Sequence, residues 1–198
     1  MRNHMGLTGA QAAERVLHGA GIYDVRIERV AGNLTDHYDP RNKVLRLSDA
    51  TYGQCSVAAV GVAAHECGHA IQHARGYAPL QFRSVLVPVA NFGSMIAWPL
   101  IVLGLFINSQ SSALLINIGI LAFSLAVLFQ LVTLPVEYNA SGRAVRILAE
   151  TGMMQGEEIV ATKKVLNAAA LTYVASAAAA ILQLVRILIL TGGRRRDD

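Results

Sequence analysis

The chain has 198 residues, of which 54% are hydrophobic and only 15% are charged, and its mean hydropathy is +0.42. Ordinary soluble domains carry roughly 25% charged residues, so a fully soluble globular protein, a disordered chain, a collagen and a coiled coil are all excluded. The net charge of +4 comes from scattered basic residues without interleaved aromatic residues, which gives no support for binding nucleic acid.

Residues 1–83 are predicted to form a soluble segment that begins with a helix. Thr8 and Gln11 match a capping box, in which each side chain satisfies a backbone amide of the first helical turn. Gly19 and Gly21 are expected to end this helix, because glycine adopts the left-handed conformation common after a helix C-terminus.

Short strands are expected next, over residues 25–30 and 44–47, where β-branched and other apolar residues recur. The sequence at 38–42 contains Asp, Pro and Asn and is typical of a turn. An Ala- and Val-rich helix follows, with either Ser48 or Ser56 as its cap.

Residues 84–136 form a run of 53 residues without a single Asp, Glu, Lys or Arg. A hydrocarbon core of ~30 Å needs about 20 apolar helical residues, so the run is long enough for two crossings. The polar stretch at 108–112 divides it, and we expect a transmembrane hairpin with spans at 84–107 and 113–134.

Charged, helical sequence returns at 137–167 and is predicted to be an amphipathic segment. Another charge-free run leads to a third transmembrane helix and a basic tail over 168–198. The sequence therefore predicts a mainly α multi-pass membrane protein with a small β element and about three transmembrane helices.

The distribution of basic residues indicates the orientation in the membrane. The link at 108–112 carries no Lys or Arg, whereas the soluble segments on either side of the hairpin carry thirteen. The positive-inside rule then places both soluble segments in the cytoplasm, in the cytoplasmic membrane of the cell. Arg194–Arg196 in the tail disagree with this orientation, because a third crossing would place them outside. The thirteen basic residues of the soluble segments are the larger set, and we base the orientation on them.

A His-Glu-x-x-His motif at 65–69 is the strongest chemical signal. Two histidines four residues apart lie one turn apart on the same helix face, so His65 and His69 can both reach one Zn²⁺. Glu66 lies beside the metal instead of on it, where it can act as general base and then general acid in peptide hydrolysis. The motif also arises by chance, but unpaired His and Glu would be costly in so apolar a helix.

A catalytic zinc needs a third protein ligand. Gln72 and Arg75 stand where a metzincin would have Gly and His, and His73 cannot wrap around the same ion from a straight helix. The remaining candidates are four downstream carboxylates: Glu137, Glu150, Glu157 and Glu158. Glu137 is preferred because it is the first charge after the long apolar run and small residues follow it.

Several segments together carry a family resemblance: residues 34–40, 65–72, 86–91, 129–137 and 166–174. On these the chain resembles the YugP-type neutral zinc metallopeptidases of bacterial membranes, from about residue 6 to 190. The resemblance implies an integral membrane zinc peptidase with a minimal gluzincin-like core, in which His65 and His69 hold one zinc per chain and Glu66 acts as the base. It also implies a further N-terminal transmembrane helix, which Met1–Met5 do not provide.

A more distant resemblance concerns the third ligand. Glu137–Ser141 is similar to the ExxAD segment of the heat-shock-type membrane proteases and the CAAX prenyl proteases, in which the Glu is the third zinc ligand. Ser141 stands where those proteins have Asp. It shares a helical face with Glu137 and is expected to orient a zinc-bound histidine.

Two further residues are candidates for stabilising the transition state. His37 can donate a hydrogen bond to the oxyanion if its strand lies beside the zinc-binding helix, and the alternative is that it only decorates a turn. Tyr138 is a second candidate donor, although an aromatic residue at a membrane interface needs no such role.

The sequence thus predicts a membrane-integrated zinc metalloendopeptidase that cuts peptides or membrane proteins near the cytoplasmic surface, with a role in protein quality control. The competing hypothesis is a non-catalytic zinc-binding membrane module whose site is closed by a fourth ligand such as His37 or Cys67. A membrane scaffold in which the motif is accidental is the third.

Overall fold

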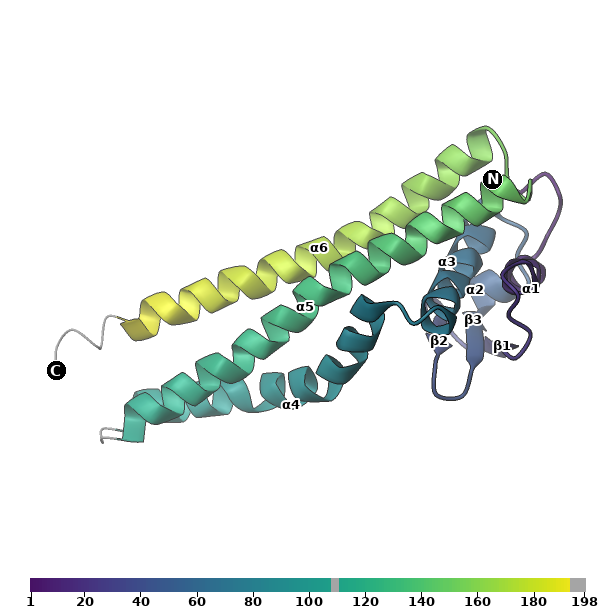
Figure 1. Ribbon diagram of the computed structural model, residues 1–198. Coiled ribbons are helices and arrows are strands. Elements are labelled where there is room, and N and C mark those ends of the chain that lie inside the picture. Colours follow the sequence, from purple (N-terminus) through teal and green to yellow (C-terminus); the bar gives the residue numbers. More distant parts are fainter. Residues whose placement is uncertain (108–110, 193–198) are drawn as a thin grey trace. The chain divides into compact units, whose positions relative to one another are not determined.

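The computed structural model describes residues 1–107 and 111–192, which are mainly helical with one small sheet (Figure 1). The elements in chain order are α1 (Gly9–Gly19), β1 (Arg26–Val30), β2 (His37–Asp39), β3 (Val44–Ser48), α2 (Asp49–Tyr52), α3 (Val57–Ala74), α4 (Ala78–Phe106), α5 (Ser111–Glu150) and α6 (Glu157–Gly192). With 73% helix and three candidate membrane-spanning helices, the predicted fold class is confirmed.

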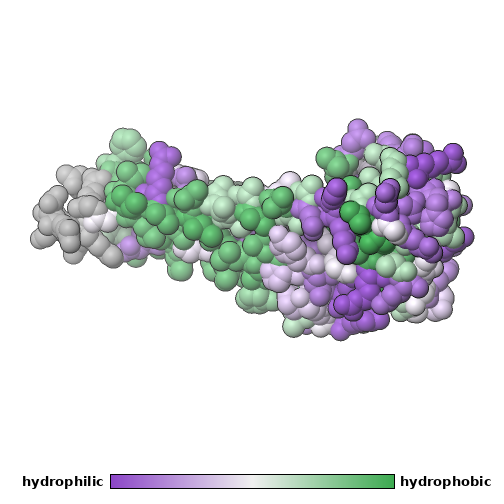
Figure 2. Space-filling model, turned by 90° about the horizontal axis from the view of Figure 1, so that it is seen from above, coloured by the Kyte–Doolittle hydropathy of each residue, from purple (hydrophilic) through white to green (hydrophobic). Residues whose placement is uncertain are grey.

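The described residues divide into two compact units. Unit 1 contains Met1–Leu80 and Val136–Leu171, and unit 2 contains Gln81–Pro135 together with the described residues from Thr172 onward. On the face shown in Figure 2, polar side chains dominate the surface of unit 1, whereas apolar side chains cover most of unit 2.

Helices α4, α5 and α6 are long and apolar enough to cross a membrane. Each helix contains one predicted span, except that the first, 84–107, runs one residue past the end of α4 at Phe106. Of the predicted link at 108–112, residues 108–110 lie outside the described residues, as does the basic tail at 194–196, whereas Ser111 and Ser112 belong to α5. Helix α5 does not end at the predicted span but continues without interruption through Pro135.

The N-terminal caps explain where the helices of unit 1 begin. The capping box of α1 forms as predicted: Thr8 Oγ1 accepts from Gln11 N, and Thr8 N donates to Gln11 Oε1. Of the two serines proposed as caps for one helix, each precedes a helix of its own. Ser48 stands before the short α2, and Ser56 caps α3 by accepting from Ala59 N at 3.1 Å.

The sheet has the strand order β1-β3-β2, with β1 parallel and β2 antiparallel to β3. The prediction of a turn at 38–42 was wrong at its start, because residues 37–39 pair with β3 and the turn begins only after them. Asp39 is responsible for this sharp boundary, since its Oδ1 accepts from the backbone amides of Arg41 and Asn42.

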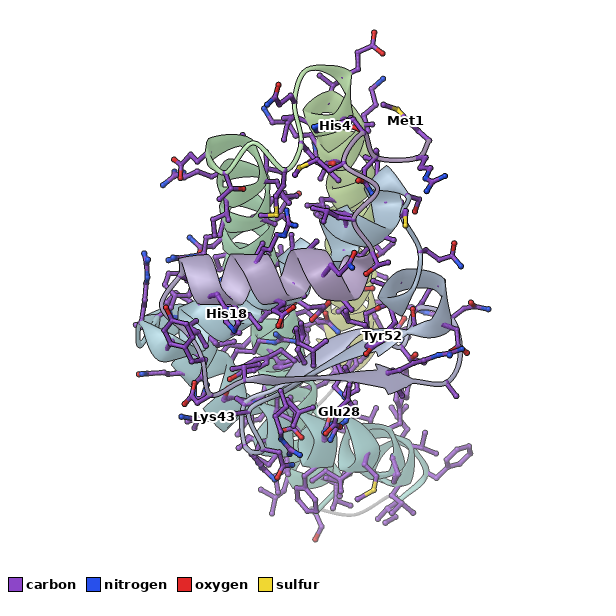
Figure 3. The ribbon with its side chains drawn as sticks, turned by 90° about the vertical axis from the view of Figure 1, so that its right-hand side faces the viewer. Met1, His4, His18, Glu28, Lys43 and Tyr52 are labelled. Carbon is purple, nitrogen blue, oxygen red and sulfur yellow. The ribbon has the colours of Figure 1, made fainter. Side chains whose placement is uncertain are left out.

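The core of unit 1 lies between α1, β3 and α3, with a contribution from the last turns of α5. In Figure 3, α1, which carries His18, runs across the strands that carry Glu28 and lead from Lys43. The largest fully buried apolar side chains of this core are Val16, Leu17, Leu45, Leu47, Val60, Ile71, Leu148 and Met154. This packing fixes α3, which carries the candidate site.

Candidate metal centre

Helix α3 brings the two histidines of the motif onto one face. It is an 18-residue helix whose apolar residues are largely buried, and Arg75 and Gly76 end it, the latter at φ +61°. The rings of His65 and His69 lie 4.8 Å apart, centre to centre, and nearly perpendicular at 87°. Their Nε2 atoms consequently face one common space.

Glu137 of α5 completes the group. Its Oε2 atom lies 3.2 Å from His65 Nε2 and 3.6 Å from His69 Nε2, and the residue is only 2% exposed. The candidate ligand atoms of the three residues all lie within 4.8 Å of one another. The structure thus joins the three residues that the sequence proposed as metal ligands, although 68 residues separate Glu137 from His69 in the chain.

A close approach of two backbones makes this meeting possible. Gly68 of α3 lies against Ala140 of α5, so near that a Cβ atom on Gly68 would stand 2.6 Å from the Ala140 carbonyl oxygen and 3.0 Å from its Cα. No side chain fits there. Gly68 therefore allows α5 to approach until Glu137, one turn before Ala140, reaches the histidines.

The three residues fit a zinc ion. Both histidines use Nδ1 for other partners, His65 with Ser141 Oγ at 3.0 Å and His69 with Gln72 Oε1 at 3.0 Å, so that Nε2 of each ring remains for a metal. Two imidazole nitrogens and one carboxylate form the ligand set of many catalytic zinc sites, which keep the fourth position open.

Without a metal, His69 binds a proton more tightly than an ordinary histidine does. Burial by itself lowers the pKa of His69, but the hydrogen bond that His69 donates to Glu137 and the charges of Glu66 and Glu137 outweigh it and raise the pKa above the ordinary value. Metal and protons compete for the same nitrogen, so the metal affinity of this site falls as the solution becomes more acidic.

Comparison with known proteins agrees with this geometry. Residues 1–192 match the family described as "Putative neutral zinc metallopeptidase". The chain belongs to this family. It is also similar to the "Putative membrane protease YugP" of Bacillus subtilis (strain 168), with 47% identity over 190 residues that cover 96% of this chain and 83% of the relative. No solved structure matches the chain.

Within this family member, Glu66 lies next to the ligands without being one of them. It follows His65 directly on α3 and is partly exposed. Burial is the main cause of the raised pKa of the Cys67 thiol, and the charge of Glu66 adds to it, as it does to the raised pKa of His69. A carboxylate in this place is close enough to influence the centre electrostatically. It also remains accessible from solvent.

The structure does not bring His37 together with the metal ligands. Its ring hydrogen bonds with Thr35 O at 2.8 Å and lies 3.4 Å from Arg46 Nη1, its cross-strand partner on β3. Side chains alternate along a strand, and it is the neighbouring Tyr38 that faces α3. The prediction of His37 as an oxyanion donor therefore lacks support from its position, because the strand presents its other face to the helix.

Tyr38 forms a contact that the sequence did not suggest. Its hydroxyl hydrogen bonds with Nδ1 of His73 at 2.9 Å, one helical turn beyond His69. Burial, together with the charges of Asp24 and Asp39, raises the pKa of Tyr38 to about 12, which keeps the phenol protonated. His73 is thus engaged with the sheet and is not part of the ligand group.

The other candidate ligands lie elsewhere. Glu158 pairs with His4, whose Nδ1 is 2.6 Å from Glu158 Oε2, as the position of His4 beside the start of α6 indicates (Figure 3). Glu150 ends α5 and Glu157 begins α6. The Cys67 side chain is fully buried against α1, with Sγ 3.6 Å from Ala13 O, so it packs in the core instead of closing the site.

Three residues of α5 near Glu137 have different surroundings. Tyr138 is 47% exposed. Ser141 lies at His65, as described above. Arg143 donates from Nε to Asn139 Oδ1 at 2.7 Å, and its guanidinium carbon stands 5.9 Å from the centre of the Tyr77 ring.

Sequence reasoning missed Gln72 as a part of the centre. It appeared only as the residue that excludes a metzincin, yet it is fully buried and contacts His69 directly. One signal was available: Gln72 is a polar residue on the apolar face of a helix, three positions after a histidine, and a buried amide needs partners.

Proposed function

We propose that the chain is a membrane-integrated, zinc-dependent metalloendopeptidase. The observation that carries this proposal is the convergence of His65 Nε2, His69 Nε2 and Glu137 Oε2 on one space, with Glu66 beside them. Among the described residues no fourth histidine, cysteine or carboxylate joins this group, which favours an open, hydrolytic site over a closed structural one.

The residues of the chain then divide the chemistry between them. His65, His69 and Glu137 hold one zinc, which when bound polarises the scissile carbonyl and lowers the pKa of water. Glu66 accepts the proton of the attacking water and passes it to the leaving amine nitrogen, so that the amine departs neutral. Ser141 hydrogen bonds with His65 and steadies its ring.

Strand β2 is a suitable place for the substrate backbone. Within the described part of the chain it pairs with β3 along one edge only, and its Tyr38 contacts α3. An extended peptide can add to such an edge through main-chain hydrogen bonds. We propose polypeptides as substrates, above all membrane proteins and segments close to the bilayer, and a role in protein quality control.

We further propose that the protein is a multi-pass component of the cytoplasmic membrane with the site in the cytoplasm. Three helices are long and apolar enough for crossing. The soluble stretches that contain the candidate ligands carry most of the basic residues, which favours the cytoplasmic side.

Replacing the proposed base tests the function. Glu66→Gln should reduce hydrolysis of a fluorescently labelled unfolded protein by more than about 100-fold, because the amide cannot accept the proton. Zinc content of the detergent-purified protein should stay near one per chain. Glu150→Gln is the control, because Glu150 is exposed at the end of α5 in unit 1, and this variant should keep both the activity and the zinc content of wild type.

The outcomes separate the alternatives. Wild type that binds zinc without hydrolysing any peptide would favour the non-catalytic zinc module. Zinc lost in Glu66→Gln would contradict the assignment of Glu66 as base and make it a ligand. Wild type without zinc would overturn the metallopeptidase proposal.

A further inference from the structure

Gln72 lies in the middle of a chain of polar side chains that links the two helices of the metal centre. The residue is 0% exposed. Its Oε1 lies 3.0 Å from His69 Nδ1, while its Nε2 donates to Val136 O at 2.8 Å and to Asn139 Oδ1 at 3.1 Å. Asn139 Oδ1 also accepts from Arg143 Nε at 2.7 Å.

The direction of every hydrogen bond in this series of side chains follows from Arg143 at its end. A guanidinium has only donors, so the Asn139 atom that faces Arg143 must be its oxygen. The same oxygen faces Gln72, which must therefore present its NH₂ group. The carbonyl of Val136, which can only accept, requires this orientation independently.

The orientation of Gln72 then decides the state of His69. Since the NH₂ group of Gln72 points to α5, its carbonyl oxygen points to His69 and can only accept. Nδ1 of His69 must carry the hydrogen. When the ring is neutral, as it must be to bind a metal, its lone pair can then only be on Nε2, the atom that faces Glu137 Oε2.

The corresponding bond of His65 has no such direction. Its Nδ1 partner is the hydroxyl of Ser141, and a hydroxyl can donate as well as accept. Ser141 holds the ring of His65 in place but does not by itself select the nitrogen that carries the proton. The two histidines of the motif are thus supported in different ways.

We propose that Gln72 is a positioning residue for the metal centre. It sets the ring orientation and the protonated nitrogen of His69, and it ties α3 to the backbone of α5 at Val136, the residue before Glu137. Asn139 and Arg143 act through it by fixing its amide. The role rests on the zinc site proposed above, but it concerns a residue outside the ligand set and a network that reaches from a surface guanidinium to a zinc ligand.

Zinc affinity of three variants, measured by competition with a chromophoric chelator, tests this role. Gln72→Met keeps the volume and loses every hydrogen bond, and affinity should fall by about 10- to 100-fold, the usual effect of losing a partner of a zinc-bound histidine. Asn139→Asp keeps the accepting oxygen and should stay within about threefold of wild type. Asn139→Leu removes the acceptor and should lie between the two.

A nuclear magnetic resonance measurement separates positioning from mere packing. In the zinc-loaded protein labelled with ¹⁵N-histidine, wild type and Asn139→Asp should show a slowly exchanging Nδ1–H for His69. In Gln72→Met the Nδ1–H of His69 should lose its protection from exchange. The Nδ1–H of His65, which is bonded to Ser141, should stay protected. Thermal unfolding of the zinc-free proteins should show that each variant is folded.

Each outcome is decisive. Gln72→Met that is folded and binds zinc within twofold of wild type would overturn the role, as would a zinc-loaded wild type in which Nδ1 of His69 carries no proton. Asn139→Asp as weak as Asn139→Leu would overturn the assigned hydrogen-bond directions. Wild type with zinc but without peptidase activity would overturn the proposed function while the variants still decide the role of Gln72, and wild type that takes up no zinc would overturn both.

Discussion

Helix α5 takes part in two close helix–helix contacts that serve different purposes. In unit 1 it meets α3 where Gly68 faces Ala140. In unit 2 it meets α4 at three glycines, Gly93 and Gly104 of α4 and Gly119 of α5. In all four places an added Cβ would lie within 3.0 Å of a backbone atom of the other helix.

The side chains around these contacts differ. The contact in unit 1 is flanked by polar groups that bond across it, Glu137 and Ser141 toward the histidines of α3 and Gln72 toward α5. The contact in unit 2 has mainly apolar side chains around it: an added Cβ on Gly104 or Gly119 would meet Ile116 or Ile101 besides the backbone. A hydroxyl also bonds across it, because Ser112 Oγ donates to the Gly104 carbonyl.

The difference teaches what close approach achieves in each environment. Helices in a bilayer gain no hydrophobic free energy from associating, so small residues that permit dense packing supply the contact energy. In unit 1 the core already holds α3 and α5 together, and the glycine instead sets the distance at which short polar side chains can reach one another. Substitutions at the two kinds of glycine should therefore have different consequences.

The largest effect is expected for Gly68→Ala. The new methyl group meets the Ala140 carbonyl and Cα, neither of which can move away without the whole helix. We expect overpacking to lower the free energy of unfolding by about 1–3 kcal/mol and to separate Glu137 from the histidines, so that zinc affinity falls by more than about 100-fold. Zinc content and thermal unfolding measure the two effects.

Gly142→Ala is the matched control, because it lies on the same helix α5 and a Cβ there meets nothing within 4 Å. It should bind zinc as wild type does and unfold at the same or a higher temperature, since Ala favours a helix over Gly. Normal zinc affinity in Gly68→Ala would show that the close approach does not set the position of Glu137.

A smaller and different effect is expected for Gly119→Ala in unit 2. Its methyl group would stand 2.9 Å from the Ala97 carbonyl and 2.6 Å from Ile101 Cγ1. The isoleucine can turn aside, but the carbonyl cannot. We expect a loss of about 1–3 kcal/mol in the stability of the α4–α5 hairpin, measured as unfolding in detergent, with zinc affinity unchanged. Loss of zinc in this variant would contradict the separation of the two roles.

The sequence was sufficient for those features that depend on local pattern. The histidines four residues apart needed only the helical period, and the uncharged runs needed only the length of a membrane crossing. Glu137 was proposed because it is an isolated carboxylate after 53 uncharged residues, and the structure places it beside the two histidines. The capping box of α1 at Thr8 and Gln11 is equally local and was also predicted.

Features that depend on tertiary contacts could not be predicted. Strand β2 is only three residues long and is stabilised by its pairing with β3. Three residues carry too little pattern to predict a strand, so only a turn was predicted in this part of the chain. His37 and Tyr38 are adjacent, and a sequence without a known strand register cannot show which of them faces α3. The network of Gln72, Asn139 and Arg143 could be predicted only if it were known that α5 passes beside α3 at Gln72.

The smallest effect is expected for Ser141→Ala, which removes one polar group of the unit 1 contact without altering the distance between the helices. His65 Nδ1 loses its partner at 3.0 Å, and zinc affinity should fall by about tenfold, while the thermal stability of the zinc-free protein changes little. Ser124→Ala on the same helix is the control, because that hydroxyl donates only to its own helix at Ile120 O, and zinc affinity there should stay at the wild-type value. A reduction in Ser141→Ala as large as in Gly68→Ala would mean that the hydrogen bond, more than the backbone approach, holds the centre together. No reduction at all would leave the helix spacing and the Gln72 network as the sufficient support of the two histidines.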